Sequence, residues 1–366
     1  MALAYLGISL SNQIKNPLRD QLGEYSNQEL LQSKLSHDEY SLLLDGLKIF
    51  DFVQELALIT TCNRFELLVF IEDGQDSHDN INKLREAISS VNKSETHLDY
   101  LKDDDAKLQF LRTYAGLNSG LIGEDEICMQ IEIAFKQCFH MEYLGKQGIQ
   151  LLHDAQSLRS TINEYIYQER VSYCTVAIES ALKHFGTNHF SNIIIAGSGS
   201  TAHQSSLSLV KLKQDPNNFT LAHRISSSSS QISNIKASTV LEGMSYLRCK
   251  HGYHSQKMKD LVQDADLVIL GIDSRLPSIH FTKHNKTPVI DFSSKPSLSF
   301  DDDASQINYL SSPQLDQYVR YYSERRMNQI GFMAKIELAE ALIAKSLQTT
   351  NHRNKVTMTS SHQGAY

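Results

Sequence analysis

The sequence predicts a multidomain α/β protein, and three observations carry this prediction. The chain has 366 residues, which is more than one ordinary hydrophobic core accommodates. Its first part mixes strand and helix patterns, whereas after Gly186 short apolar strands alternate with helices, as in a parallel sheet covered on both faces. A long segment without proline separates the two parts.

Composition and charge exclude several classes of protein. Hydrophobic residues make up 41% of the chain, and no apolar run approaches the roughly 18 residues of a membrane-spanning helix. The N-terminus has no basic leader, so we expect a cytoplasmic protein without a membrane partner. Five cysteines without metal-ligand spacing argue against disulfides and structural zinc, and we expect no metal. The net charge of −7 does not favour nucleic acid, which would need a local basic face.

Residues 1–147 are predicted to form an N-terminal α+β domain that carries the catalytic group. We expect strands at 2–10, 55–62 and 65–72, and helices at 27–35, 37–50, 76–92, 105–123 and 125–144. The two neighbouring strands flank a polar run, Thr60–Arg64, which contains one thiol and one guanidinium.

Helical segments frame the second domain. Residues 148–186 are interpreted as one long bridging helix, or two collinear ones, and the domain that includes it spans 148–311. Apolar residues at helical spacing predict a C-terminal helical region at 312–348. A second subunit is the simplest cover for that apolar stripe, so we expect a homodimer. The tail at 349–366 is polar and without periodicity, and we expect it to be disordered.

The second domain begins with a turn suited to a dinucleotide. An apolar strand leads into a turn that opens a helix, formed by Gly197, Ser198, Gly199 and Ser200. The first glycine permits a tight turn, and the second lets the backbone approach a pyrophosphate, whose charge the helix N-terminus attracts. Ala202 stands in place of the third glycine of this pattern. Tight strand–helix turns also use glycine for purely structural reasons.

The end of the next strand favours NADPH over NADH. It carries His223 and Arg224 where an acidic residue would hold the ribose 2′-hydroxyl of NAD. A guanidinium instead suits a 2′-phosphate. The sequence therefore predicts a Rossmann-like domain with NADPH as its cofactor, the alternative being an ordinary surface arginine at a strand end.

Cys62 lies two residues from Arg64 in the polar run of the first domain. A nearby cation favours the thiolate, which is the nucleophilic form of cysteine. The polar neighbours Thr61 and Asn63 suit a core poorly. The alternative is a small buried residue at a strand end.

A second polar patch interrupts an apolar frame between residues 116 and 130. Ser119, Glu124 and Gln130 are its polar positions, and glycines precede the helix that follows. Carboxylates near a helix N-terminus are also explained by capping alone. Cys128 and Cys138 on that helix are expected to be buried.

Together these motifs resemble the glutamyl-tRNA reductase family, over almost the whole chain and in the same order. The segment "TTCNRFEL" is similar to the family's "STCNRTE", and "GLNSGLIGEDEICMQIEIAF" to "GLDSLVLGExQILGQVKxAF". The strand and turn "IIIAGSGSTA" with "LAHR" parallels "LLVGAGEM" with "IANRT". The segment "SERRMNQIGFMAKIELAEALI" parallels the dimerisation helix "ERRxxAxxEAExII".

The resemblance implies an NADPH-dependent oxidoreductase that reduces glutamyl-tRNA to glutamate-1-semialdehyde, the first step of C5 tetrapyrrole (haem) synthesis. Cys62 would attack the ester carbonyl, free the tRNA and form a thioester that NADPH reduces. The glutamyl group would be held by Thr61, Arg64, Ser119, Glu124 and Gln130, with Glu126 beside it. NADPH would be held by Gly197, Gly199 and Arg224. The family also implies a homodimer, and the following aminomutase as a candidate partner.

The sequence departs from the family at several positions. Leu10 and Leu101 stand where the family has histidine, and Glu126 where it has glutamine. Loss of a general acid or base typically costs about 10²–10⁴-fold in rate. Two other interpretations stay open: a paralogue that takes another aminoacyl-tRNA, and a silent homologue that binds tRNA, haem or a partner. A dehydrogenase of free metabolites would leave "TTCNRFEL" without a role.

Overall fold

The computed structural model forms two compact units, each with its own sheet. Unit 1 comprises Met1–Arg170 and Arg326–Tyr366, and unit 2 comprises Val171–Arg325. The structure describes residues 1–9, 35, 37–61, 64–92, 98–165, 172–187, 189–224, 236, 238–253, 256–272, 279–281, 287–293, 298–300 and 308–362. The helix predicted at 27–35 therefore lies almost wholly outside the described residues.

Unit 1 is built on a four-stranded antiparallel sheet with the order β2-β3-β1-β4. Its strands are β1 Ala2–Ser9, β2 Val53–Thr61, β3 Arg64–Ile71 and β4 Asp99–Lys102. The central strand β3 is buried at every residue, because helices cover both faces of the sheet. The strands predicted on either side of Cys62 are confirmed.

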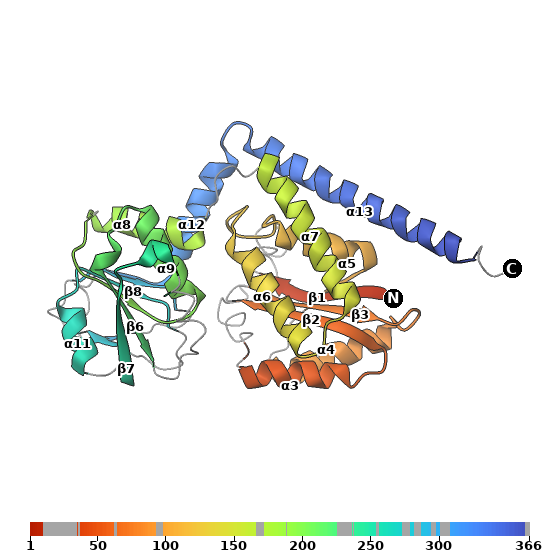
Figure 1. The fold of residues 1–366 in the computed structure, drawn as a ribbon, viewed down its shortest axis with the longest axis horizontal. Helices are drawn as coiled ribbons and strands as arrows, with labels where there is room; N and C mark the ends of the chain where they lie inside the picture. Colours follow the sequence, from red (N-terminus) through yellow and green to blue (C-terminus); the bar gives the residue numbers. More distant parts are fainter. Residues whose placement is uncertain are drawn as a thin grey trace, which may run out of the picture. The chain divides into compact units, whose positions relative to one another are not determined.

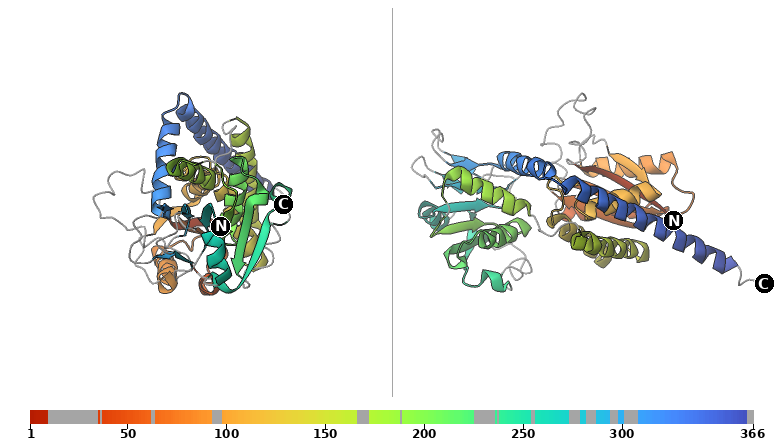
Figure 2. Two further views of the ribbon diagram at one scale, coloured as in Figure 1. Left: turned by 90° about the vertical axis from the view of Figure 1, so that its left-hand side faces the viewer. Right: turned by 90° about the horizontal axis from the view of Figure 1, so that it is seen from above.

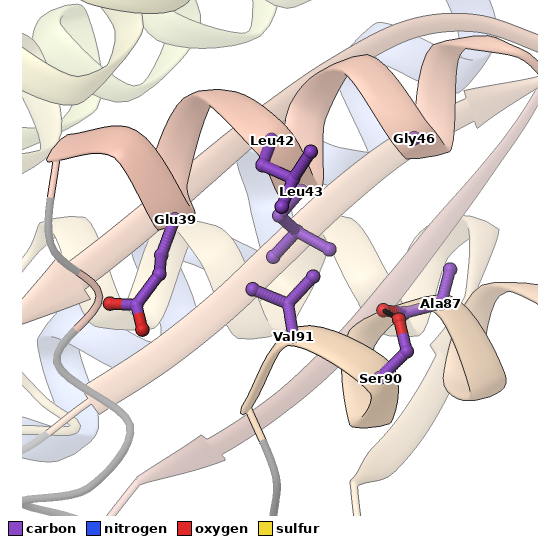
Figure 3. A pocket seen from close by; sticks show the side chains of 7 residues that line it. All are labelled: Glu39, Leu42, Leu43, Gly46, Ala87, Ser90 and Val91. Carbon is purple, nitrogen blue, oxygen red and sulfur yellow. Dashed lines mark hydrogen bonds between the residues drawn. The ribbon is translucent and has the colours of Figure 1, made fainter.

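Two layers of helices enclose this sheet (Figure 1). One layer contains α3 His37–Lys48 and α4 His78–Asn92, and the other contains α5 Asp103–Tyr114, α6 Glu126–His140 and α7 Lys146–Tyr165. A shallow, largely apolar groove separates α3 from α4 (Figure 3). It is lined by Glu39, Leu42, Leu43, Gly46, Ala87, Ser90 and Val91. None of the residues that the sequence singles out lines this groove.

The helix predicted at 105–123 is shorter than expected, because α5 ends at Tyr114. Gly116 and Gly123 have φ of 76° and 83°, a left-handed conformation that favours glycine and ends a helix. The Gly123 N–H donates a hydrogen bond of 3.0 Å to the Gly116 carbonyl. We call residues 116–125, which this bond closes and which lead into α6, the site loop.

The C-terminal helices belong to different units. Helix α12, Ser312–Met327, lies almost wholly in unit 2, whereas α13, Phe332–His362, lies in unit 1. In the apolar stripe for which the sequence expects a second subunit, Leu315 and Val319 are buried, and Met327 and Ile336 pack against the core of unit 1. The chain itself therefore covers part of this stripe. Phe332, Ala339 and Ile343 of α13 are buried in the same core.

Helix α13 continues through residues 349–362, where the sequence predicts a disordered tail. No glycine or proline interrupts residues 332–362, so the backbone pattern of the helix can persist although its side chains are polar. Its C-terminal end extends beyond the sheet of unit 1 (Figures 1 and 2).

Unit 2 contains a six-stranded parallel sheet with the order β12-β10-β8-β5-β6-β7. Its strands are β5 Ile193–Ala196, β6 Phe219–Arg224, β7 Ser245–Tyr253, β8 Leu267–Leu270, β10 Val289–Asp291 and β12 Tyr309–Leu310. Numbered from β5, this is the order 3-2-1-4-5-6 of doubly wound dinucleotide-binding folds. The predicted Rossmann-like fold is confirmed.

The other elements of unit 2 complete this architecture. The helices are α8 Tyr173–Phe185, α9 Ser200–Lys211 and α11 Gln256–Gln263, and β9 Ile279–Phe281 pairs with β11 Leu298–Phe300. The predicted bridging segment is thus two helices, α7 and α8, which belong to different units. No helix among the described residues is long and apolar enough to cross a membrane.

Candidate functional site

Arg64 is the first residue of β3, and its guanidinium is buried with only 4% of the side chain exposed. Its Nη1 donates to Glu66 Oε1 at 2.6 Å and to Thr113 Oγ1 at 3.4 Å. Its Nη2 donates to the Asn118 carbonyl at 3.0 Å. Burial alone would lower the pKa of Arg64, but Glu66, Tyr5 and Glu124 together outweigh burial, and the pKa is raised. Arg64 is therefore charged and internally paired.

The hydrogen bond from Arg64 to Asn118 joins two motifs that lie far apart in the sequence. Arg64 belongs to "TTCNRFEL" on β3, and Asn118 belongs to the site loop. The side-chain amide of Asn118 donates to Gln109 Oε1 at 3.1 Å and to Thr113 Oγ1 at 3.3 Å. Arg64 and Asn118 thus hold the site loop against the end of β3.

Cys62 and Asn63 lie outside the described residues, between β2 and β3. Thr61, the last residue of β2, is half-buried and lies opposite Arg64 in the strand register. The four described cysteines offer poor nucleophiles, because none is exposed. Burial raises the pKa of both Cys128 and Cys138, which disfavours their thiolates.

Glu124 and Ser119 meet within the site loop. Burial, and then the Glu126 carboxylate, raise the pKa of Glu124 to about 7, while Ser119 and two arginines act in the opposite direction. The Ser119 hydroxyl is buried and makes no hydrogen bond of regular geometry. A carboxyl with this pKa exchanges a proton readily near neutral pH, as a general acid or base must.

Glu126 and Gln130 lie on α6, four residues apart and therefore on the same side of the helix. Both side chains are half-buried. The structure therefore gathers four of the predicted substrate residues around the start of α6: Ser119, Glu124, Glu126 and Gln130.

Arg159 on α7 is a site residue that the sequence analysis did not single out. It is 5% exposed, and its Nη1 donates to the Tyr114 carbonyl at 2.6 Å. Its Nη2 donates to the Glu124 carbonyl at 3.1 Å and to Asp125 Oδ1 at 2.7 Å. Asp125 makes no cap hydrogen bond to α6, so its carboxylate serves this ion pair. Arg159 fixes the end of the loop opposite Arg64.

Unit 2 presents its glycine turn at the switch point of the parallel sheet, between β5 and β8. Gly197 has φ of 137°, and a Cβ there would lie 2.5 Å from the Gly271 carbonyl oxygen, so only glycine fits. A Cβ on Gly199, the cap of α9, would meet open space. The first turn of α9, which begins at Ser200, has no acidic residue. This turn fits a pyrophosphate, which needs close backbone approach and an unopposed helix N-terminus.

His223 and Arg224 end β6 at the same edge of the sheet as Gly197, because Ala196 pairs with Ala222 in parallel register. His223 is buried with 7% exposed. The Arg224 side chain lies outside the described part of the chain. No carboxylate stands at this strand end, which agrees with a phosphate-bearing ribose more than with a free 2′-hydroxyl.

Comparison with known proteins relates the chain to one family. Residues 26–164 match the family model "Glutamyl-tRNAGlu reductase, N-terminal domain". The glutamyl-tRNA reductase of Sulfolobus acidocaldarius is 27% identical over 230 residues, which is 61% of this chain and 50% of that protein. That of Methanothrix thermoacetophila is 28% identical over 181 residues, 48% of this chain and 41% of that protein. The aligned part of the chain thus covers half or less of the length of these relatives.

A solved structure is also similar along the chain. The glutamyl-tRNA reductase from Methanopyrus kandleri aligns with 97% of this chain and 81% of that chain, at 18% sequence identity and a TM-score of 0.49. The matched family model ends at residue 164, one residue before the end of α7 in unit 1.

Proposed function

Because the chain belongs to the glutamyl-tRNA reductase family as a divergent member, we propose that it reduces glutamyl-tRNA to glutamate-1-semialdehyde with NADPH. This reaction is the entry step of C5 tetrapyrrole synthesis. The reaction class, oxidoreductase, agrees with the doubly wound parallel sheet of unit 2.

One observation supports this proposal most strongly, the hydrogen bond from Arg64 Nη2 to the Asn118 carbonyl. It brings Arg64, which follows Cys62 by two residues in the sequence, beside the loop that contains Ser119 and Glu124. A nucleophile, a proton donor and polar groups for an acyl substrate are the parts that acyl transfer requires.

In the first half-reaction the Cys62 thiolate would attack the acyl carbon of the ester between the amino acid and the tRNA. A carbon–sulfur bond forms, the carbon–oxygen bond breaks, and the tRNA 3′-oxygen leaves. Glu124, with its pKa near 7, would give its carboxyl proton to that oxygen. The buried charge of Arg64, one residue beyond Asn63, favours the ionised thiol.

In the second half-reaction a hydride would add to the thioester carbon and the carbon–sulfur bond would break, which releases the aldehyde and regenerates the Cys62 thiolate. NADPH, held by Gly197, Ser198, Gly199, Ser200 and the end of β6, would supply the hydride. In unit 1 the substrate is oriented by Ser119 and Gln130, with Thr61 at the strand end. The half-buried loop limits water, which would otherwise hydrolyse the thioester.

We further propose a cytoplasmic homodimer that contacts tRNA. The apolar side chains of Ile330, just before α13, and of Met333 and Leu338 in its first two turns are exposed, and a second copy would bury them. Sedimentation equilibrium tests the dimer. A Met333→Glu variant should be monomeric, whereas Glu337→Gln on the same helix should not change the mass.

Intact-protein mass spectrometry tests the chemistry most directly. The purified protein is incubated with glutamyl-tRNA without NADPH, and a mass gain of one glutamyl group is expected on Cys62. The adduct should disappear on treatment with hydroxylamine, which cleaves thioesters. Cys62→Ala should give no adduct, whereas Cys128→Ser, which removes a half-buried thiol, should still give it.

Addition of NADPH should convert the adduct into free semialdehyde, measured as one NADPH oxidised per aldehyde formed. NADPH oxidation that persists in Cys62→Ala would contradict the catalytic assignment. An adduct with another aminoacyl-tRNA, but none with glutamyl-tRNA, would identify a paralogue of different specificity. Glu126 at a glutamine position of the family is the observation that favours testing this second candidate.

A further inference from the structure

Helix α13 packs directly on the elements that carry the candidate site. Its buried residues Phe332, Ala339 and Ile343 belong to the same hydrophobic cluster as α5 and α7. Figures 1 and 2 show α13 running along this layer of unit 1. Helix α13 therefore shares a hydrophobic core with α5, the helix that leads into the site loop.

A polar path leads from α13 into the loop. Glu340 Oε1 lies 2.9 Å from Arg112 Nη2, with 31% and 28% of the two side chains exposed. The Nε of Arg112 in turn donates to Asn118 Oδ1 at 3.4 Å. Asn118 is the residue whose carbonyl accepts from Arg64. One guanidinium thus links α13 to the residue that joins the two site motifs.

A second arginine links the start of α13 to the same loop. Arg326 Nη1 donates to the Ile122 carbonyl at 3.2 Å. The guanidinium of Arg326 also lies over the Phe332 ring, 4.8 Å from its centroid. Because Phe332 is buried in the unit 1 core, the docked helix fixes the arginine that holds Ile122.

We propose that α13 positions the site loop, with Arg112 and Arg326 as the positioning residues and Glu340 as the group that orients Arg112. The inference rests on the proposed function in that the loop carries Ser119 and Glu124. Loss of the α13 contacts would leave the loop anchored from β3, α5 and α7, without the two arginines that α13 holds in place, and its side chains would be less firmly oriented. An event that moves α13, such as binding of a partner chain, would then alter the site.

Hydrogen exchange of the full chain tests this coupling without requiring turnover. The amides of Leu117, Gly123 and Glu124 are reporters, since each donates to a main-chain carbonyl within α5 or the loop. Glu340→Gln should accelerate their exchange about two- to fivefold, the effect expected for one half-buried ion pair. Glu337→Gln, an exposed carboxylate one turn earlier on α13, should leave their exchange unchanged.

A double variant that exchanges the charges of Arg112 and Glu340 distinguishes two roles of this ion pair: positioning of the site loop, and attachment of α13 to unit 1 alone. In Arg112→Glu with Glu340→Arg, the ion pair to α13 can re-form, but a carboxylate cannot donate to Asn118 Oδ1. The α13 amides should regain protection while the loop amides stay fast. Full recovery of the loop, or no effect of Glu340→Gln, would overturn the proposal. If the proposed chemistry is correct, Glu340→Gln should also lower kcat more than it raises KM.

Discussion

Replacement of Glu126 by glutamine should lower the pKa of Glu124. The pKa of Glu124 is raised from 4.5 to about 7, first by burial and second by the Glu126 carboxylate, against the opposing effects of Ser119, Arg64 and Arg159. Glu126→Gln removes the second cause and keeps the first. The pKa should therefore fall below 7 and remain above 4.5.

The raised pKa has a defined effect on stability. Between pH 4.5 and 7 the folded chain holds a proton on Glu124 that the unfolded chain has lost, so the free energy of unfolding falls as the pH rises. At high pH, the rise of the Glu124 pKa from 4.5 to about 7 lowers the free energy of unfolding by about 3 kcal/mol. The free energy of unfolding of Glu124→Gln, minus that of the wild type, should therefore be about 2.5 kcal/mol larger at pH 8 than at pH 5.

Carbon-13 NMR of carboxyl-labelled glutamate measures the titration, with the Glu124 signal assigned by its absence in Glu124→Gln. Urea unfolding followed by far-ultraviolet circular dichroism at pH 5 and pH 8 measures the stability difference. Glu86→Gln on α4, an exposed carboxylate outside the site, is the control and should change neither result. A Glu124 midpoint near 4.5 in the wild type, or one that Glu126→Gln does not move, would refute the reasoning.

Three further predictions follow from single contacts. Arg64→Met should destabilise the chain by about 3–5 kcal/mol in urea unfolding, because it leaves the buried Glu66 carboxylate unpaired; a loss below 1 kcal/mol would contradict the buried pair. Gly197→Ala should reduce NADPH binding at least tenfold in calorimetry, since its Cβ would lie 2.5 Å from the Gly271 oxygen; unchanged affinity would place the cofactor elsewhere. Arg159→Met should accelerate proteolysis within the site loop. A cleavage rate equal to that of the wild type would show that the loop keeps its conformation without Arg159.

Much of the fold could be predicted from sequence because local patterns determined it. The apolar runs beside Cys62 predict β2 and β3, and the alternation of short apolar strands with helices after Gly186 predicts the parallel sheet. The helix expected through 105–123 was wrong because apolar residues continue beyond Tyr114, whereas the positive φ of Gly116 ends the helix at Tyr114. A glycine within an apolar pattern does not by itself show whether it adopts the left-handed conformation that ends a helix.

The contacts that hold the site were harder to predict, because they join distant segments. Signals for two of them existed. Glu66 follows Arg64 by two residues on a strand, so both side chains lie on one face. Arg159 lies between Ala155 and Ile162 at helical spacing, on the buried side of α7, and a buried arginine requires partners. No local pattern, however, indicates which carbonyls those partners are.

The arginines of unit 1 explain how the site loop can keep its shape while its chemistry diverges. Arg64, Arg159 and Arg326 come from β3, α7 and the end of α12, and each donates to a main-chain carbonyl of the loop. Main-chain acceptors are the same whatever side chains the loop carries. Substitutions of the loop side chains or at the start of α6, such as glutamate at position 126, can therefore change which substrate charge the site accepts and the pKa of its carboxyl groups. They do so without changing the backbone of the loop. Specificity should thus follow the side chains of this segment, and the arginines should tolerate no exchange for lysine, which cannot donate in the same fixed geometry.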